Sequence, residues 1–425
     1  MPGPPVPYRP SRHDTYLTDT PTDTLPVKTV RSLSANQPSA TIRQAFTGNS
    51  PSVERYEKLN RVGEGTYGIV YRARDKASGT IVALKRIRME QEQEGLPLSS
   101  LREISLLKSL RHENVVSVLD VVVGNGLDNI FMVMEYCEQD MGNLMDNVIS
   151  KGAHPGYREA EVKCLMSQLL TGLAYLHDNY IIHRDLKLSN LLLTSSGILK
   201  IADFGLARKF GTPVRPMTPR VVTLWYRAPE LLFGEKSYTT AIDMWAVGCI
   251  FGELIRARPL LPGKVEQQQL DLICRLLGTP NARIWPGFDK LPYAKSVKLP
   301  SIPYDDIAGQ FSEQKESVRK LLKSLLTYYP PSRLTVHEAL RHDYFRESPP
   351  PCAPVLLPTY PELRTEEFAR IPRHNDRKRP RVEDRDVSRV RRSRGQLDPS
   401  ILSRAREEEE ELELGVPAYQ QFRFS

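Results

Sequence analysis

The amino-acid sequence predicts an α+β fold in which a small β-rich region precedes a larger helical region. Three observations support this prediction. Short strand patterns joined by glycine turns occupy residues 56–86, a long amphipathic helix pattern begins at Glu159, and the two patterns do not alternate along the chain. Alternation would instead indicate a parallel βαβ sheet. No internal repeat of fixed period is visible.

The chain has 425 residues, and its composition changes along its length. Residues 1–55 are rich in Pro, Ser and Thr and poor in large apolar side chains, so we expect a disordered N-terminal arm. Residues 56–345 carry strand and helix periods and form the expected folded domain. Residues 346–425 are Pro-rich, then basic over 377–394 and acidic over 407–411, which predicts a largely disordered tail.

Composition excludes several classes of protein. The 59 basic and 51 acidic residues give a net charge of +8, which is too small to indicate a nucleic-acid binder. No apolar run is long enough for a transmembrane helix, and Met1–Tyr8 does not resemble a secretory signal. The five cysteines form no Cys-x-x-Cys pair, which disfavours a zinc site or a disulfide framework and favours a reducing compartment. We expect a soluble protein without a membrane partner.

The folded domain begins with predicted strands over residues 56–61, 69–74 and 80–86. A helix is predicted over 98–110, because apolar residues recur there every third position. These residues are Leu101, Ile104, Leu107 and Leu110. Two more strands are predicted over 115–123 and 130–136, and the helix that begins at Glu159 keeps one apolar face as far as Leu176.

The segment Gly63-Glu64-Gly65-Thr66-Tyr67-Gly68 matches the pattern Gly-x-Gly-x-x-Gly. A dinucleotide site would place this pattern between a strand and a helix. Here Ile69 and Val70 continue as a strand, so the glycines lie in a hairpin. Such a hairpin can cover a phosphate chain, because glycine has no Cβ to block a close approach. An ordinary glycine turn would use the same residues, so the pattern alone leaves both interpretations open.

A lysine on the next predicted strand follows this hairpin. Lys85 ends the segment Val82–Lys85, where it can reach the α and β phosphates of a nucleotide. Glu103 on the following helix is the candidate partner for an ion pair. Ser100 and Glu103 also fit a capping box, in which the glutamate only closes the start of the helix.

Further polar segments follow in a fixed order. They are His183-Arg184-Asp185-Leu186-Lys187-Leu188-Ser189-Asn190, Asp203-Phe204-Gly205 and Ala228-Pro229-Glu230. Their order and spacing resemble the eukaryotic protein kinase family. The resemblance implies a bilobal protein kinase fold: a β-rich N-lobe with one regulatory helix over 56–134, a hinge over 135–140 and a larger helical C-lobe over 141–345. It also implies ATP and Mg²⁺ as cofactors, with the ATP γ-phosphate transferred to protein.

The resemblance gives each catalytic position a role with a physical reason. Asn190 and Asp203 offer the hard oxygen ligands that Mg²⁺ prefers. Asp185 is expected to accept or orient the proton of the substrate hydroxyl, and Lys187 suits a γ-phosphate oxygen. A lysine at this position resembles Ser/Thr kinases rather than Tyr kinases. The implied catalytic residues are therefore Lys85, Asp185, Lys187 and Asn190.

The resemblance also implies the positions that contact ATP. Backbone groups of Glu135 and Cys137 are expected to bond the adenine. Met134 is the expected gatekeeper at the back of the pocket, and Asp140 is expected to meet the ribose. The other implied positions are Val62, Gly63, Glu64, Gly65, Thr66, Tyr67, Gly68, Ile69, Val70, Ala83 and Lys85.

Three stretches resemble the cyclin-dependent kinase group more closely than other kinases. They are Pro97–Glu103, Val221–Glu230 and Asp243–Cys249. The first is nearest to the signature helices of the PISSLRE and PITSLRE subfamilies, and the sequence leaves the choice between these two open. The resemblance implies a cyclin partner that packs on the signature helix and pushes Glu103 towards Lys85, as a partner that biases a two-state element.

The resemblance also implies regulatory positions. Thr218 matches the phosphoacceptor of the activation segment, where a phosphate adds about −1.5 to −2 charge. Arginine can bond phosphate oxygens bidentately. The arginines that match the phosphate-gathering positions are Arg102, Arg184 and Arg208. Thr66 and Tyr67 match inhibitory phosphosites of relatives.

Substrate choice is implied in the same way. Val222 and Arg227 match residues that shape the site after the phosphoacceptor, where a substrate proline loses no backbone hydrogen bond. We therefore expect proline-directed phosphorylation of Ser or Thr, in the regulation of the cell cycle or of transcription and RNA processing. Glu230 and Arg333 are expected to form a buried structural pair in the C-lobe.

Two other hypotheses remain. A kinase-like scaffold would bind partners without turnover, but such scaffolds usually lack at least one of Lys85, Asp185, Asn190 and Asp203, and all are present here. The basic stretch over 377–394 fits a solvated tail without a specific role, a nuclear localisation signal or a nucleic-acid patch. We expect the protein in the nucleus, the cytoplasm or both, with the nucleus favoured. No aromatic residues are interleaved with the basic stretch, so we do not expect a nucleic-acid partner.

Overall fold

The computed structural model describes residues 51–65, 68–87, 98–124, 126–149, 156–211, 216–219 and 221–358. The arm predicted over residues 1–55 lies outside these ranges as far as Ser50, but residues 51–55 are described, and Ser52 makes an isolated bridge to Val123. The basic and acidic stretches of the tail, and Thr66 and Tyr67, also lie outside these ranges. Within them, no helix combines the length and the apolar character that crossing a bilayer requires.

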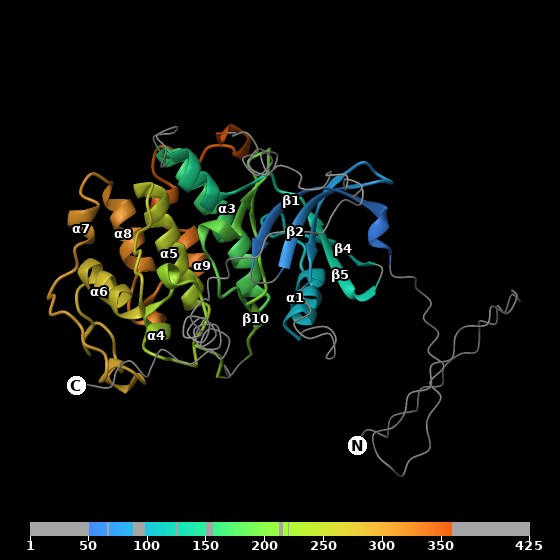
Figure 1. Ribbon diagram of the computed structural model, residues 1–425. Helices are drawn as coiled ribbons and strands as arrows, with labels where there is room; N and C mark the ends of the chain where they lie inside the picture. Colours follow the sequence, from blue (N-terminus) through green and yellow to red (C-terminus); the bar gives the residue numbers. More distant parts are fainter. Residues whose placement is uncertain are drawn as a thin grey trace, which may run out of the picture. The chain divides into compact units, whose positions relative to one another are not determined.

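An antiparallel sheet forms the N-lobe, with five strands in the order β1-β2-β3-β5-β4 (Figure 1). The strands are β1 Tyr56–Gly65, β2 Gly68–Asp75, β3 Ile81–Arg86, β4 Val118–Gly124 and β5 Gly126–Glu135, and a short 3-10 turn, η1 Val53–Arg55, precedes them. Alternate residues of these strands bury one apolar face. Its buried members are Tyr56, Ala73, Val82, Leu84, Val122, Phe131 and Val133.

All five predicted strands are present, but the starts of the last two are shifted. β5 begins at Gly126 rather than Ile130. β4 begins at Val118 rather than Val115, because Val115 instead makes an isolated bridge to Ile201. The predicted helix is α1 Leu98–Ser109, and it lies beside β4 in Figure 1. One member of its predicted apolar face, Leu101, is 47% exposed. Glu103 is buried instead, because it pairs with a lysine of the sheet.

The C-lobe is mainly helical, which confirms the α+β class. Short strands lie at its start, in a three-stranded sheet β6-β8-β9 and a two-stranded sheet β10-β7. The strands are β6 Gln139–Asp140, β7 Ile181–Ile182, β8 Leu191–Leu193, β9 Leu199–Ile201 and β10 Arg208–Lys209. The α-helices are α2 Met141–Asn143, α3 Glu159–Asp178, α4 Pro229–Leu232, α5 Ala241–Arg256, α6 Glu266–Leu277, α7 Ile307–Gln310, α8 Glu316–Leu325 and α9 Val336–Leu340. The shorter turns are η2 Leu144–Ile149 (a π-helix), η3 Leu188–Asn190, η4 Leu224–Tyr226, η5 Phe288–Lys290, η6 Pro330–Ser332, η7 Asp343–Phe345 and η8 Pro354–Leu356.

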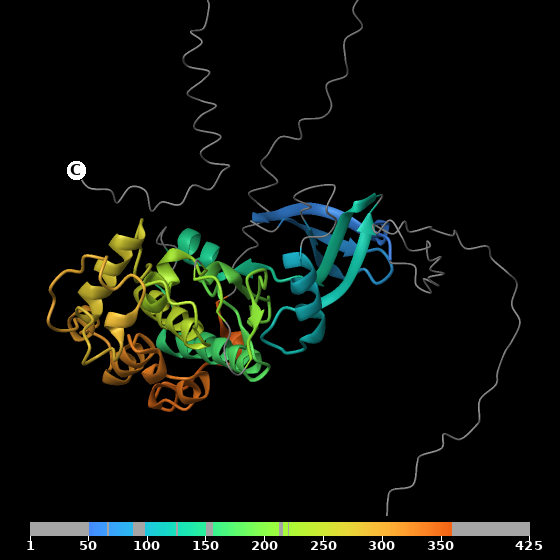
Figure 2. The ribbon, with the colours of Figure 1, turned by 90° about the horizontal axis from the view of Figure 1, so that it is seen from below.

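The core of the C-lobe is built around α3 and α5, which pack against each other (Figures 1 and 2). Every residue of α5 from Ile242 to Leu254 is buried, as expected for a helix surrounded by others. The predicted pair of Glu230 and Arg333 is confirmed. Nη1 and Nη2 of Arg333 donate to the two carboxylate oxygens of Glu230 at 2.7 and 2.9 Å, and both side chains are buried.

Residues 346–358, which the sequence assigns to the Pro-rich tail, pack against the C-lobe. Nζ of Lys163, on a side chain that is 0% exposed, donates to the backbone oxygens of Glu347 and Pro349 at 2.7 and 2.8 Å. The N–H of Cys352 donates to the oxygen of Ala160 at 3.0 Å. Leu357 joins the apolar core. The compact domain therefore continues beyond Phe345.

Candidate active site

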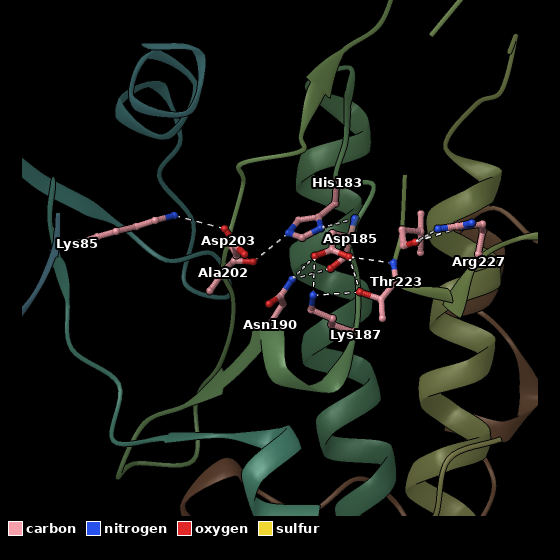
Figure 3. A network of polar contacts seen from close by, with 10 residues as sticks. Lys85, His183, Asp185, Lys187, Asn190, Ala202, Asp203, Thr223 and Arg227 are labelled. Carbon is pink, nitrogen blue, oxygen red and sulfur yellow. Dashed lines mark hydrogen bonds and ion pairs between the residues drawn. The ribbon is translucent and has the colours of Figure 1, made fainter. Parts of the chain in front are cut away.

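The site begins at Lys85 on β3, the central strand of the N-lobe sheet. Its Nζ lies 2.7 Å from Oε1 of Glu103. The same atom lies 3.3 Å from Oδ1 of Asp203 (Figure 3). Burial opposes a charge on Lys85, but the negative charges of Glu103 and Asp203 outweigh it, so the pKa of Lys85 is raised above its ordinary value. Lys85 therefore stays an ammonium and connects the N-lobe to the C-lobe.

The position of Glu103 decides between an ion pair with Lys85 and a capping box with Ser100. Helix α1 begins at Leu98, so Ser100 lies inside the helix and is not its N-cap. Glu103 is 6% exposed, and its carboxylate accepts from Lys85. The structure therefore shows the ion pair and not the capping box.

The loop between β7 and β8 presents the carboxylate of Asp185, and donors reach it from several sides (Figure 3). Oδ1 accepts from the N–H and the hydroxyl of Thr223 at 3.1 and 3.0 Å. Oδ2 accepts from Nζ of Lys187 at 2.8 Å and from Nδ2 of Asn190 at 3.1 Å. Lys187 also donates to the Thr223 hydroxyl at 3.0 Å. These bonds fix the orientation of the carboxylate.

A second layer of bonds holds this loop. The backbone N–H groups of His183 and Arg184 donate to the carboxylate of Asp243 on α5 at 2.9 and 3.0 Å. Although Asp243 is buried, these donors and the adjacent His177 hold the pKa of its carboxyl below its ordinary value. Nε2 of His183 donates to the oxygen of Ala202 at 3.0 Å, since a carbonyl only accepts. The catalytic loop is thereby tied to the residue before Asp203.

Asn190 and Asp203 are the candidate metal ligands. The N–H of Ala202 donates to the backbone oxygen of Asn190 at 2.9 Å, which joins their two segments. Nδ2 of Asn190 is used by Asp185, so its amide oxygen is the atom suited to a cation. Among the described residues, no group of three or more His, Cys, Asp or Glu side chains is placed to hold a metal. A carboxylate and an amide oxygen suit Mg²⁺, which shares its coordination with nucleotide phosphates.

The glycine segment forms the predicted hairpin between β1 and β2. Gly63 pairs with Val70 and Gly65 with Gly68 across the strands, which agrees with the hairpin and not with a strand–helix turn. Gly68 has φ +141°, a conformation open to glycine, and a Cβ on Gly63 would meet no atom within 4 Å. Thr66 and Tyr67 at the tip lie outside the described residues, as does the side chain of Glu64.

The predicted hinge begins at Glu135, the last residue of β5, directly after Met134. Met134 pairs with Ala83 of β3, which places both on neighbouring strands. The side chain of Glu135 accepts from the N–H of Ser117 and from Lys200. Its role is therefore structural, because it joins β5 to these two segments. Asp140 is 4% exposed and caps α2, since its carboxylate accepts from the N–H and Nδ2 of Asn143 at 2.7 and 2.8 Å. The structure thus shows a capping role for Asp140.

The predicted phosphate-gathering arginines occupy different settings. Arg102 is exposed on α1, and Arg208 lies on β10, where Nη1 donates to the oxygen of Ala207. Arg184 is 3% exposed. Thr218 is exposed, and its backbone oxygen is joined to Arg184 through the hydroxyl of Tyr238. Within the described residues, the hydroxyl of Tyr238 thus connects Arg184 to Thr218.

Val222 and Arg227 lie together in the activation segment. Nε and Nη2 of Arg227 donate to the oxygen of Val222 at 3.2 and 3.0 Å, and Nη1 pairs with Glu266 at 2.7 Å. Val222 has φ +66°, a left-handed conformation that is uncommon for a β-branched residue. Arg184 and Asp203 also have left-handed backbone conformations, with φ +66° and +63°.

Sequence reasoning missed Thr223, Asp243 and Tyr238. Thr223 and Asp243 each belong to a stretch that signalled the kinase group, but nothing in either residue type indicated a bond to the catalytic loop. Tyr238 carried no sequence signal, because its two hydroxyl bonds connect residues far apart in the chain.

This arrangement of side chains defines a protein kinase. It combines a lysine paired with a helix glutamate, an aspartate held by a lysine and an asparagine, and a second aspartate that faces the first lysine. Residues 56–345 match the family model described as protein kinase domain. Cyclin-dependent kinase 10 of Mus musculus is 56% identical over 322 residues, which cover 76% of this chain and 88% of that protein. Cyclin-dependent kinase 11B of Rattus norvegicus is 51% identical over 311 residues, 73% of this chain and 70% of that protein. The chain belongs to the cyclin-dependent kinase group of the protein kinase family.

The chain is accordingly a serine/threonine protein kinase of the cyclin-dependent type, and protein kinases in general use ATP and Mg²⁺. Cyclin-dependent kinase 10 of Homo sapiens matches over the same share of this chain, at 55% identity.

Proposed function

We propose that this chain, bound to a cyclin, transfers the γ-phosphoryl group of ATP to a Ser or Thr that precedes a proline in a protein substrate. The observation that carries the proposal is the connected set of side chains in Figure 3. Lys85 contacts Asp203, and Asp185 is held by Lys187, Asn190 and Thr223. Phosphoryl transfer depends on such positioning and charge neutralisation.

In this proposal, the nucleotide lies between the glycine hairpin and the hinge. Backbone groups of Glu135 and Cys137 bond the adenine, Met134 limits the back of the pocket and Asp140 meets the ribose. Lys85, fixed by Glu103, holds the α and β phosphates. The remaining proposed contacts are Val62, Gly63, Glu64, Gly65, Thr66, Tyr67, Gly68, Ile69, Val70 and Ala83.

Asn190 and Asp203 are the residues we propose for holding Mg²⁺. The metal, when bound, neutralises the charge of the phosphates. Asp185 then accepts a hydrogen bond from the substrate hydroxyl and takes up its proton as transfer proceeds. Lys187, which is 2.8 Å from Oδ2 of Asp185, is placed between this carboxylate and the transferred group, where its charge stabilises the developing negative oxygens.

The proposed specificity for proline rests on Val222 and Arg227. The oxygen of Val222 is already bonded by Nε and Nη2 of Arg227, and its backbone is turned into the left-handed region. A substrate residue that follows the phosphoacceptor therefore gains little from an N–H directed at this oxygen. Proline has no N–H to leave unpaired, so it is favoured there.

We further propose two controls on activity. A cyclin on α1 would stabilise the inward position of Glu103, and phosphate on Thr218 would attract Arg102, Arg184 and Arg208. Thr66 is a proposed inhibitory phosphosite together with Tyr67. The basic stretch over 377–394 supports nuclear import, and with it a role in the cell cycle or in transcription and RNA processing.

A phosphate-transfer assay tests this function, with the purified chain bound to the cyclin that co-purifies from cells. We expect Asp203→Asn to reduce phosphate transfer to a Ser-Pro peptide by about 10²–10³-fold, the scale for losing one key electrostatic group. Asp289→Asn, a change of the same kind at an exposed position of η5, should leave transfer intact. Equal incorporation by wild type and Asp203→Asn would favour a scaffold without turnover.

A further inference from the structure

Tyr238 lies between α4 and α5, and only 3% of it is exposed. Its hydroxyl donates to the backbone oxygen of Thr218 at 2.8 Å and accepts from Nη1 of Arg184 at 2.7 Å. The direction of both bonds is fixed, because a carbonyl cannot donate and a guanidinium cannot accept. One hydroxyl thus joins the residue before Asp185 to the segment that carries Thr218.

Arg184 is itself held firmly at the other end of this connection. Its Nε donates to the oxygen of Leu206 at 2.7 Å, just after the Asp203-Phe204-Gly205 segment. Its backbone N–H donates to Asp243 at 3.0 Å. The guanidinium therefore lies between the segment of the candidate metal ligand and Tyr238, and it cannot follow Thr218 without losing bonds.

The residues that follow Thr218 in the chain include Val222, which we propose for substrate choice, and Thr223. The N–H of Val221 donates to the oxygen of Pro219 at 2.9 Å, which turns the chain towards Val222 and Thr223. Thr223 in turn bonds Asp185. Burial raises the pKa of Tyr238 despite the adjacent positive charge of Arg184, so the hydroxyl keeps its proton and can donate.

We propose that Tyr238 is a positioning residue that holds the substrate-binding part of the activation segment through Arg184 while the Thr218 hydroxyl carries no phosphate. This inference rests on the proposed function, in which Thr218 is the regulatory phosphoacceptor. A phosphate there offers Arg184 a charged acceptor, and charge-assisted bonds are roughly twice as strong as neutral ones. The hydroxyl of Tyr238 is therefore an uncharged counterpart of the phosphate, and its contribution is largest before phosphorylation.

Amide hydrogen exchange on the full chain with its cyclin tests the positioning directly. In the unphosphorylated form, Tyr238→Phe should speed exchange in the peptide that carries Thr218 by about tenfold, the effect of losing one hydrogen bond to a charged group. In the form phosphorylated on Thr218, separated by ion exchange and checked by mass spectrometry, the increase should be much smaller. Unchanged exchange in the unphosphorylated variant would overturn the proposal.

Tyr328→Phe is the matched control. Its hydroxyl is also buried and also donates to a backbone oxygen, that of Gly278 at 2.7 Å. Gly278 follows the C-terminal end of α6, whereas the activation segment contacts Glu266 at the N-terminal end. This variant should leave exchange around Thr218 unchanged. An increase as large as that in Tyr238→Phe would show that any lost tyrosine hydroxyl loosens the C-lobe, and the proposal would be wrong.

Kinetics supply a readout that a purely structural role would not move. In the unphosphorylated form, Tyr238→Phe should raise KM for a Ser-Pro peptide by about tenfold and leave KM for ATP unchanged. A fall in kcat with both KM values unchanged would indicate less folded enzyme and would contradict the proposal. A wild-type chain without any kinase activity would count against the proposed function, and the exchange data would still decide the role of Tyr238.

Discussion

The carboxylate of Asp185 illustrates how single residues tune this site. One of its oxygens accepts only from Thr223 among the described residues, and the other accepts from Lys187 and Asn190. The orientation of this carboxylate therefore depends on a residue from the activation segment as well as on its own loop. Chemistry at Asp185 is thereby coupled to the conformation of that segment.

Replacing Thr223 tests this coupling. We expect Thr223→Ala to lower kcat for peptide phosphorylation by about tenfold, because Asp185 and Lys187 both lose the hydroxyl that aligns them. Thr223→Ser keeps the hydroxyl and should retain most of the activity. Steady-state assays with a Ser-Pro peptide measure both variants, and equal kcat values for alanine and serine would contradict this role.

The ion pair of Lys85 and Glu103 gives a second test at the residue scale. Glu103→Gln removes the nearer of the two negative charges that raise the pKa of Lys85. We expect kcat/KM for ATP to fall by about 10²–10³-fold, since Lys85 is no longer held in place. Glu316→Gln, at an exposed carboxylate on α8, is the control and should have no effect on kinetics. Full activity of Glu103→Gln would show that the pair is dispensable.

At the scale of elements, Glu253 on α5 is a buried acid that catalysis does not use. It accepts from the hydroxyl of Tyr226 in η4 at 2.6 Å. Burial raises its pKa from 4.5 to about 7, an effect that Tyr226 opposes and the charge of Asp146 in η2 reinforces. Cys249, one turn earlier on α5, also lies near this group, and burial raises the pKa of that thiol. Neutral Glu253 therefore fits this contact between α5 and the activation segment.

This pKa predicts how stability depends on pH. Between pH 4.5 and 7 the unfolded chain releases the proton of Glu253 while the folded chain keeps it, so this residue lowers stability as pH rises through that range. Glu253→Gln removes the effect. We compare the free energy of unfolding of the variant with that of wild type. The difference should be about 3 kcal/mol more in favour of the variant at pH 8 than at pH 4, because one pKa unit is worth about 1.4 kcal/mol. Urea unfolding at both pH values measures it, and a constant difference would refute the assignment.

Periodicity and turn residues predicted most of these elements correctly. The five strands, α1 and α3 follow from apolar spacing and glycine turns, which are local signals. Leu101 and Val115 departed from the pattern for non-local reasons: Glu103 takes the inward position on α1, and Ile201 of the C-lobe pairs with Val115. The side-chain roles of Thr223 and Tyr238 depend on contacts between distant segments, which one sequence does not contain.

At the scale of the whole molecule, the segment after Phe345 is part of the folded domain. Lys163 has a buried ammonium whose acceptors include the oxygens of Glu347 and Pro349, and Leu357 fills the core. A buried charge that loses its partners is costly. The Pro-rich composition predicted disorder here, because it contains few apolar residues and the acceptors that matter are backbone oxygens, which every sequence has.

Truncation tests the extent of the domain. A chain that ends after Phe345 should be less stable than one that ends after Pro358 by about 3 kcal/mol, because the Lys163 ammonium loses its hydrogen bonds to Glu347 and Pro349, each worth about 1.5 kcal/mol or more, and keeps its ion pair with Glu159. Its thermal midpoint should drop by several degrees, since about 1 kcal/mol shifts Tm by about 2–4 °C at this size. Calorimetry on the two chains measures the difference. Equal midpoints would place the end of the compact domain at Phe345.

The left-handed backbones of Arg184, Asp203 and Val222 lower thermal stability at positions that the active site uses. Each non-glycine residue held in that region costs about 1–3 kcal/mol, and glycine would relieve it. Glycine at Arg184 or Asp203 would also remove the bonds of those side chains, whereas Val222 is bonded to Arg227 through its backbone oxygen. A library selected only for survival on heating should therefore enrich glycine at Val222, a position that we propose for substrate choice. Directed evolution of this enzyme needs an activity filter in every round.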